Sequence, residues 1–220
     1  MNLIYDTGLI SLCIQIITGI FDVYVLTLPV TGNAIFLKIL LLLELIVQII
    51  EGTFYVWLVS QLYKKQSITQ YRYYDWLITT PTMLFTYCMY LIYESNNEKT
   101  FEEAINENLY LFTIIMGLNT LMLFFGYIAE RGVLDFMTAA LFGFVPFFMM
   151  FYLIYDNFAK LTEIGRMTFI YFSGVWSLYG VASVLSYTYK NIMYNVLDLL
   201  SKNFFGIFLG VLLLMKNKNM

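Results

Sequence analysis

Apolar residues follow one another in long runs along this chain, and short polar stretches separate the runs. Runs of ~20 residues that are apolar on all sides match the length of helix that crosses the hydrocarbon core of a bilayer. The pattern therefore predicts seven membrane-spanning helices. We expect them over residues 8–28, 34–62, 70–93, 104–128, 133–155 and 167–189, with the seventh between Asn191 and Lys216. Because a backbone in lipid must satisfy its own hydrogen bonds, such helices pack as an all-α bundle.

The stretches between the runs are short and polar. The predicted connectors are residues 64–67, 94–103 and 156–166 and the pair Lys190-Asn191, with turns at Gly32-Asn33 and at Glu130-Arg131-Gly132. They leave no room for a soluble domain, so we expect residues 1–220 to form one domain. The first residues lack the basic segment of a cleaved signal peptide, and the first span is expected to be retained.

Composition agrees with an integral, multi-pass membrane protein in a lipid bilayer. Hydrophobic residues make up 60% of the chain and charged residues only 12%, and the mean hydropathy is +0.74. A net charge of -3 argues against a nucleic-acid partner, and the absence of histidine excludes histidine metal sites. Cys13 and Cys88 lie in apolar runs, where cysteine usually acts as a small hydrophobe, so we expect no metal site and no disulfide.

Loop charge gives an orientation. Lysine and arginine favour cytoplasmic loops, and the side that carries the C-terminus has a small excess of them. The C-terminal side has Lys38, Lys99, Lys160, Arg166, Lys216 and Lys218, against Lys64, Lys65, Arg131 and Lys190 on the other, with Arg72 near that boundary. We therefore expect an extracellular N-terminus and a cytoplasmic C-terminus. The apolar runs do not separate lipid-facing from subunit-facing surface and leave a homo-oligomer open.

Charged residues inside two of the predicted spans indicate a functional site, because intramembrane charges are costly. Asp198 and Lys202 are four residues apart on one face of the last span. A lysine amine can form a Schiff base with a carbonyl compound, and the protonated imine needs carboxylate counter-ions. Asp75 in the third span can supply a second carboxylate. Thr79, one turn later, can hydrogen-bond this carboxylate, and Arg72, one turn earlier, can stabilise it from the outer side. Spacing alone also allows a buried ion network without chemistry.

These residues stand in a longer pattern that resembles the microbial rhodopsins. Residues 72–81, Arg-Tyr-Tyr-Asp-Trp-Leu-Ile-Thr-Thr-Pro, match the third-helix motif of that family at every specified position. Residues 198–202 followed by Gly206 resemble the seventh-helix pattern around the retinal lysine, and Trp176-Ser177-Leu178-Tyr179 resembles the sixth-helix wall of the retinal pocket. The resemblance extends over nearly the whole chain and implies a seven-helix bundle with retinal in its core.

The resemblance also implies roles for these positions. Lys202 would carry all-trans retinal as a protonated Schiff base, with Asp75 as counter-ion and proton acceptor, Asp198 as second counter-ion and Arg72 on the outer side. Trp76, Thr79, Trp176 and Tyr179 would line the chromophore. Two positions depart from the family: Gly180 stands where a proline often follows the tyrosine, and Ser183 replaces a second tryptophan.

The position of the proton donor in outward pumps of this family is held by Thr86, which cannot donate a proton at physiological pH. The second span instead carries two carboxylates on one face, Glu44 and Glu51, with Gln48 between them. Carboxylates along a helix face are suited to a cation path, although they could also be neutral and bonded to neighbouring helices. Other polar residues that could extend this path are Ser11, Gln15, Asn195 and Asn203.

A light-gated channel for monovalent cations or protons is the function these residues favour, and the glutamate-bearing second span resembles rhodopsins of large algal viruses. Three alternatives remain. The first is an outward proton pump without a carboxylic donor. The second is a photosensor, and the third is a retinal-free transporter or membrane enzyme that uses Lys202 in an ion pair. With the favoured function, the protein is not expected to be an enzyme.

Overall fold

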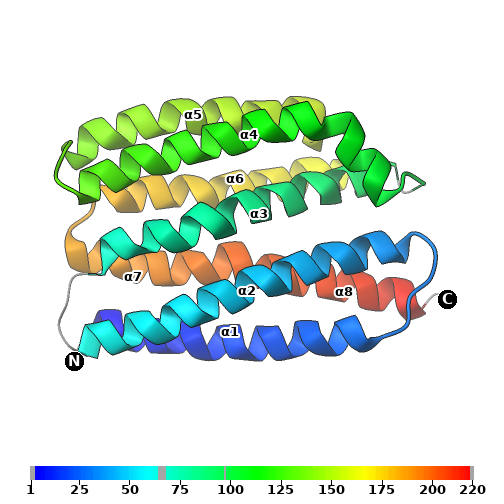
Figure 1. Cartoon of the computed structure of the whole chain (residues 1–220), viewed down its shortest axis with the longest axis horizontal. Helices are drawn as coiled ribbons and strands as arrows, with labels where there is room; N and C mark the ends of the chain where they lie inside the picture. Colours follow the sequence, from blue (N-terminus) through cyan, green and yellow to red (C-terminus); the bar gives the residue numbers. More distant parts are fainter. Residues whose placement is uncertain (1–2, 64–67, 97, 219–220) are drawn as a thin grey trace.

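The computed structural model of the chain describes residues 3–63, 68–96 and 98–218. These residues form seven membrane-length helical segments that lie side by side along the long axis (Figure 1). The helices are α1 (Leu3–Thr27), α2 (Ala34–Tyr63), α3 (Thr69–Ser95), α4 (Phe101–Glu130), α5 (Phe136–Asn157), α6 (Glu163–Ser183), α7 (Tyr187–Asp198) and α8 (Phe204–Lys218). A 3-10 turn, η1 (Ala159–Leu161), precedes α6, and a π-helical turn, η2 (Leu199–Asn203), joins α7 to α8 into one continuous span. The all-α seven-helix bundle predicted from the sequence is confirmed.

Helix ends follow local signals. Gly32 and Gly132 have φ of +56° and +72°, a backbone that glycine adopts without steric cost, and they form the two predicted turns. Thr100 and Glu103 form a capping box at the start of α4, which satisfies two otherwise unpaired backbone donors. The side chain of Asp135 accepts a hydrogen bond from the Thr138 N–H at the start of α5. The side chain and the backbone N–H of Thr138, in that order, lower the pKa of the exposed Asp135 carboxyl.

Two predicted connectors are wrong in detail. Thr162 caps α6, so residues 163–166 are helical rather than part of a loop. At its other end α6 stops at Ser183, and α7 already includes Lys190 and Asn191. Both polar side chains are buried there because they have partners on neighbouring helices. The predicted connector 64–67 lies outside the described residues.

The helix faces are sorted in the opposite sense to those of a soluble bundle. In α1 the buried positions recur every three or four residues, and most of them are polar or small. They are Ile4, Gly8, Ser11, Gln15, Thr18, Asp22 and Val25. The outward positions of α1 are large and apolar, such as Ile10, Ile17 and Ile20, each more than half exposed. This sorting is what a bilayer requires of a helix whose polar groups must find partners inside the protein.

By length and composition four of the described helical segments could each cross a membrane: Leu3–Thr27, Phe101–Glu130, Phe136–Leu161 and Tyr187–Asn217. The remaining long helices have a more polar interior face. Helix α2 carries Glu44 and Glu51, and α3 carries Arg72 and Asp75. These four side chains are buried inside the bundle, and Glu51 and Asp75 meet the last span at Lys202.

Candidate functional site: a lysine held by three carboxylates

The ammonium group of Lys202 lies at the centre of the bundle, buried to 1% exposure. Its Nζ atom is 2.9 Å from Asp75 Oδ2, 3.0 Å from Glu51 Oε1 and 3.7 Å from Asp198 Oδ1. The three carboxylates come from α3, α2 and α7, and each is at least 95% buried. We call Lys202 and these three residues the lysine cage. The structure therefore brings the two carboxylates predicted from the motifs to the lysine, and adds Glu51 as a third.

Arg72 is the second cation of the site. Its Nη1 atom lies 3.2 Å from Asp198 Oδ2, and its Nε donates to Asn191 Oδ1 at 3.2 Å. The direct ion pair of Arg72 is with Asp198, an addition to the stabilisation of Asp75 that we expected of it. Two cations against three carboxylates give the site a surplus of acidic groups. Such an arrangement suits a cationic centre that must stay buried, and removing one partner of a buried pair costs on the order of 3–5 kcal/mol.

Asp198 is held on both oxygens by tyrosines. Tyr55 on α2 donates to Oδ2 at 2.7 Å, and Tyr179 on α6 donates to Oδ1 at 2.8 Å. Asp75 is held less tightly, because its Oδ1 has no hydrogen-bond partner within the described part of the chain. The Thr79 hydroxyl, which we expected to reach this carboxylate, instead donates to the backbone oxygen of Asp75 at 2.9 Å. An acceptor with a free oxygen, 2.9 Å from the lysine nitrogen, is well placed to take a proton from it.

The lysine sits in a π-helical turn. Residues Leu199–Asn203 form η2, and Ser201, Lys202 and Asn203 are all buried. Such turns are uncommon and often mark functional sites, because the extra residue in the turn redirects the side chains that follow it. The Tyr171 hydroxyl donates to the Leu200 carbonyl at 2.8 Å, which supplies a donor to a carbonyl within the turn. Asp198, just before the turn, and Lys202, within it, are both buried, with Lys202 Nζ 3.7 Å from Asp198 Oδ1.

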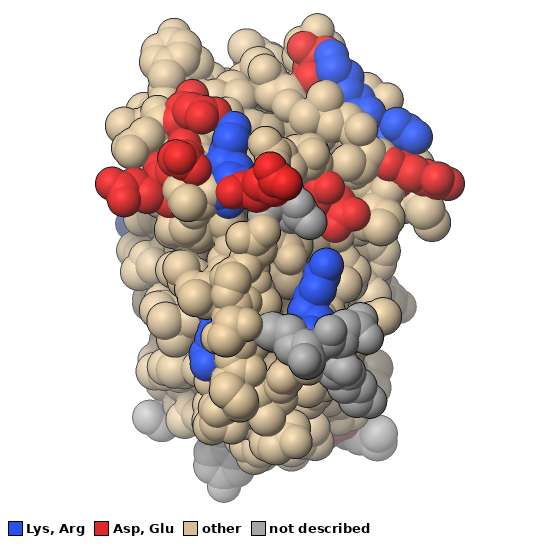
Figure 2. All heavy atoms as spheres, turned by 90° about the vertical axis from the view of Figure 1, so that its right-hand side faces the viewer, with Lys and Arg blue, Asp and Glu red and all other residues tan. Residues whose placement is uncertain are grey.

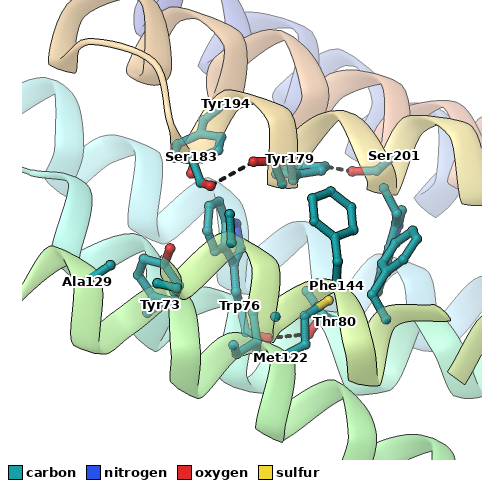
Figure 3. Close-up of a pocket in the computed structure, with 18 of the residues that line it drawn as sticks. Tyr73, Trp76, Thr80, Met122, Ala129, Phe144, Tyr179, Ser183, Tyr194 and Ser201 are labelled. Atoms are coloured by element: carbon teal, nitrogen blue, oxygen red, sulfur yellow. Dashed lines mark hydrogen bonds between the residues drawn. The ribbon is translucent and has the colours of Figure 1, made fainter. Parts of the chain in front are cut away.

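A cavity of about 100 Å³ leads away from Lys202. Its walls are mostly aromatic or small: Tyr73, Trp76, Met122, Gly126, Ala139, Gly143, Phe144, Trp176, Tyr179, Gly180, Ser183 and Tyr194 among others. Figure 3 shows Trp76, Phe144 and Tyr179 grouped around it. Trp76 stands edge-on to Tyr194 and Tyr179, with ring centroids 4.9 and 5.5 Å apart. The predicted wall residues Trp76, Trp176 and Tyr179 all reach this cavity.

The two positions that depart from the family motif also line the cavity. A side chain on Gly180 would clash with the ring of Phe144, since an added Cβ would lie 2.5 Å from Phe144 Cζ. Gly180 thus makes room for an aromatic ring from α5 that closes this part of the pocket. Ser183 lies on the wall with its hydroxyl bonded to the Gly180 carbonyl at 2.7 Å. Thr79 is fully buried, but it is not among the residues that line the cavity.

Buried polar side chains continue from the cage along α1, α2 and the last span. We call this set the polar seam: Ser11, Gln15, Asp22, Glu44, Gln48, Asn195 and Asn203, each at most 4% exposed. The Ser11 hydroxyl donates to the Asn195 carbonyl at 2.9 Å, and Asn195 in turn accepts from Arg72. The seam therefore contains the predicted path residues other than Glu51, which belongs to the cage. Within the described residues, no cluster of acidic or cysteine side chains has the geometry of a metal site.

Three residues of the site escaped the sequence analysis. Tyr55 lies four residues after Glu51 on the same face of α2, and Asn191 was assigned to a loop. Asp22 continues the Ser11, Gln15 and Thr18 spacing of α1, and that spacing is the signal that could have revealed it. A polar residue every three or four positions of an apolar helix indicates a face turned towards partners in the protein.

Comparison with known proteins agrees with the fold. The sequence model of the bacteriorhodopsin-like protein family matches residues 7–215. The chain therefore belongs to this family of membrane proteins, the microbial rhodopsins, whose members carry a retinal chromophore and act as light-driven transporters or photoreceptors. No match was found among the curated proteins.

Solved structures of the family superpose over almost the full chain. The crystal structure of the viral rhodopsin OLPVRII is 26% identical with a TM-score of 0.84, and the match covers 96% of this chain and 97% of that one. The blue light-absorbing proteorhodopsin from Med12 is 20% identical with a TM-score of 0.77, covering 97% and 98%. The light-driven proton pump of Coccomyxa subellipsoidea is 14% identical with a TM-score of 0.73, covering 96% and 97%. The latter two likenesses establish the fold alone.

The cavity has the chemistry that a retinal site needs. An amine lies at one end, and the rest of the wall is aromatic or apolar, as a polyene aldehyde requires. Its volume is below the ~300 Å³ typical of ligand pockets. Met83 and Met122 on the wall have flexible side chains that can move aside. The residues present therefore fit the chromophore that the family implies.

Proposed function

We propose that this protein binds all-trans retinal as a protonated Schiff base on Lys202 and acts as a light-gated cation channel. Bound there, retinal supplies the absorption of visible light and a light-driven change of shape that weakens the hold of the attached nitrogen on its proton. Trp76, Trp176 and Tyr179 orient it, and Gly180 with Phe144 shapes one wall of the pocket. The contacts of Lys202 with three carboxylates support this assignment.

In this mechanism Asp75 accepts the proton at its carboxylate, since Oδ2 lies 2.9 Å from Nζ and Oδ1 has no partner in the described chain. Asp198 stays ionised, because Arg72 and two tyrosines hold it. Once Asp75 is neutral and the lysine nitrogen has lost its charge, Glu51 loses its only ion pair within the described residues. The Glu51 carboxylate is then free to attract a cation or water.

The observation that carries the channel proposal is the polar seam. Ser11 and Asn195 lie beside Arg72 on one side of the cage, and Asp22, Glu44 and Gln48 lie on the other side, towards the C-terminal end of the bundle. Many atoms of the seam are buried without a hydrogen-bond partner in the described chain. They are Gln15 Nε2 and Oε1, Asp22 Oδ1, Glu44 Oε1 and Oε2, Gln48 Oε1, and Asn203 Nδ2 and Oδ1. Buried polar atoms without partners are costly, and water or a cation entering the seam would satisfy them. A seam of oxygen atoms with this need is suited to passing cations.

An outward proton pump is the second candidate, and one contact favours it. The Thr86 side chain on α3 lies beside the Glu44 carboxyl on α2, while its hydroxyl donates to the Thr82 carbonyl. A carboxylic acid thus lies beside the position where pumps of the family hold their donor, although it comes from another helix. In this case Glu44 would return a proton to the lysine nitrogen, and the protein would drive protons against a gradient.

Photocurrents from retinal-bound protein in a voltage-clamped bilayer distinguish the two candidates. For the channel we expect currents that reverse sign near the equilibrium potential of the permeant cation. Replacing sodium by a large organic cation on one side should shift that reversal potential. Currents of a single sign at every voltage, unaffected by the cation gradient, would reject the channel and support the pump.

The remaining assignments follow from the same proposal. The partners are the lipid bilayer and monovalent cations or protons. The N-terminus is extracellular and the C-terminus cytoplasmic, as loop charge favours. The lipid-exposed faces of α4 and α5 leave room for a homo-oligomer.

A further inference from the structure

One part of the polar seam lies apart from the lysine cage, between α1, α2 and α8. It consists of Asp22, Glu44 and Gln48, which are 0%, 0% and 4% exposed. Glu44 is seven residues from Glu51 along α2, roughly 10 Å towards the C-terminal end of the bundle. Glu44 lies one helical turn before Gln48 on the same face of α2, and Gln48 is hydrogen-bonded to Asp22 on α1. Two acidic groups thus share a buried site with one amide.

The hydrogen bonds of this group leave its oxygen atoms free. The Gln48 amide nitrogen donates to Asp22 Oδ2 at 2.5 Å, so the amide oxygen of Gln48 points elsewhere. Asp22 Oδ1, Gln48 Oε1 and both Glu44 oxygens are buried without a hydrogen-bond partner in the part of the chain that the structure describes. No lysine or arginine of that part forms an ion pair with Asp22 or Glu44. Four oxygens from three side chains therefore lack a positive partner.

Glycines on α8 create the room for this group. A Cβ added to Gly206 would collide with Gln48 Nε2 and lie 2.9 Å from Asp22 Oδ2. A Cβ on Gly210 would lie 2.6 Å from a ring carbon of Phe21, the neighbour of Asp22, and 3.5 Å from Asp22 Oδ1. The last span thus approaches α1 and α2 closely only because these positions have no side chain. Asp22 and Gln48 therefore pack directly against the backbone of α8.

We propose that Asp22, Glu44 and Gln48 form a binding site for one small monovalent cation, separate from the lysine cage. Carboxylate and amide oxygens are the ligands that hard cations prefer. One cation together with one proton balances the two carboxylates, so the buried site becomes neutral. This inference rests on the proposed cation conduction. It adds a binding site for the conducted cation on the C-terminal side of the lysine cage. Asp22 is then a ligand of the transported ion.

The test is a cation titration of retinal-bound protein in the dark, followed by infrared spectroscopy of the carboxyl groups. Sodium should convert a protonated carboxylic C=O band into a carboxylate band with saturation, and N-methylglucamine at the same ionic strength should not. Asp22→Asn and Glu44→Gln should each weaken the apparent sodium affinity at least about tenfold. Asp156→Asn, which changes an exposed carboxylate paired with Lys160, should leave the titration unchanged.

Visible absorption of each variant verifies that the bundle has formed. A sodium response that survives in the double variant Asp22→Asn/Glu44→Gln would overturn the site, as would an equal response to N-methylglucamine or none at all. A response to magnesium or calcium but not to sodium would overturn the monovalent assignment. Because the titration is made in the dark, it does not depend on photocurrents. One-signed currents with an intact sodium titration would reject the channel and keep the site.

Gly206→Ala offers a second, steric test. The added methyl group occupies the space of Gln48 Nε2 beside Asp22, so it should displace the amide without removing any carboxylate. We expect the sodium titration to weaken while the visible absorption maximum stays in place. An unchanged titration in this variant would show that the site does not need the arrangement seen between α2 and α8.

Discussion

Lys202 and Lys190 are both buried lysines of the last span, and their partners distinguish them. Lys190 Nζ pairs with Glu130 at 2.8 Å and lies 3.5 Å from the centre of the Phe136 ring. Lys202 faces three carboxylates and the cavity. We expect Lys202→Ala to abolish visible absorption, because it removes the attachment amine, and Lys190→Ala to keep the pigment. Reconstitution with all-trans retinal and an absorption spectrum measure both. Retained colour in Lys202→Ala would reject the attachment site.

Glu51 and Glu44 provide a matched pair on one helix. Only Glu51 touches the lysine nitrogen, at 3.0 Å, so Glu51→Gln removes a negative charge from beside the chromophore. We expect this variant to shift the absorption maximum and to change the cation conductance. Glu44→Gln should change conductance alone. Absorption spectra and reversal potentials of the two variants test this, and equal spectral shifts would contradict the placement of Glu51 in the cage.

The motif residues could be predicted because their spacing along the chain fixes their chemistry. Asp198 and Lys202 share a helix face, and Asp75 stands in a specific motif. The contact of Glu51 with Lys202 joins residues 151 positions apart in sequence, and helix spacing contains no information on such a distance. The same reason explains why the ion pair of Arg72 with Asp198, 126 positions away, was not predicted.

At the scale of the helices, the caps fix where each helix begins and contribute to its stability. Thr100→Ala removes the hydroxyl that accepts from the Glu103 N–H at the start of α4, and leaves only the bond from the residue 100 backbone N–H to the Glu103 carboxylate. The loss should destabilise the protein by about 1 kcal/mol. That corresponds to a fall of roughly 2–4 °C in the temperature at which the pigment bleaches. Thr113→Ala is the control, since this exposed residue lies within α4 and bonds only to the Leu109 carbonyl. Equal effects of the two substitutions would contradict the capping role.

Helix boundaries were predicted less well than helix existence. Residues 163–166 and Lys190-Asn191 were predicted to be connectors because they are polar, although both segments are helical. In the first case Thr162 supplies a cap that allows a charged first turn. In the second, Lys190 and Asn191 are polar because they bond across the bundle to Glu130 and Thr69. The π-helical turn at Leu199–Asn203 had no signal in the hydrophobic pattern, because one extra residue hardly alters an apolar run.

The two sides of the molecule differ in character. Helices α1, α2, α3 and the last span enclose nearly all of the buried charges, whereas α4 and α5 present large apolar side chains outward. These include Leu109, Tyr110, Leu121, Phe124, Leu141, Phe142, Val145, Phe148, Met149 and Tyr152. The overall bundle was predictable because a bilayer permits few arrangements for seven apolar runs. The sorting of polar residues to one side depended on contacts between helices.

Orientation in the membrane can be checked on the whole protein. The C-terminal end of the bundle carries a group of exposed acidic side chains, Glu98, Glu102, Glu103 and Glu107, interspersed with lysines and arginines (Figure 2). Acidic residues contribute little to topology, so the lysine and arginine count should decide. We expect an epitope tag at the C-terminus to be accessible to antibody only after cells are permeabilised. A tag at the N-terminus should be accessible on intact cells, and the opposite result would reverse the orientation.

The lysine cage has a consequence for how the pigment is made. A Lys202 side chain gripped by three carboxylates is a charged ammonium, which has no lone pair to attack an aldehyde. The contacts that stabilise the finished chromophore therefore slow its attachment. Attachment of the chromophore needs a neutral Lys202 amine, whereas the finished pigment needs a positive charge on the same nitrogen. Newly made protein should therefore take up its chromophore at a rate set by how often Lys202 loses its proton within the cage.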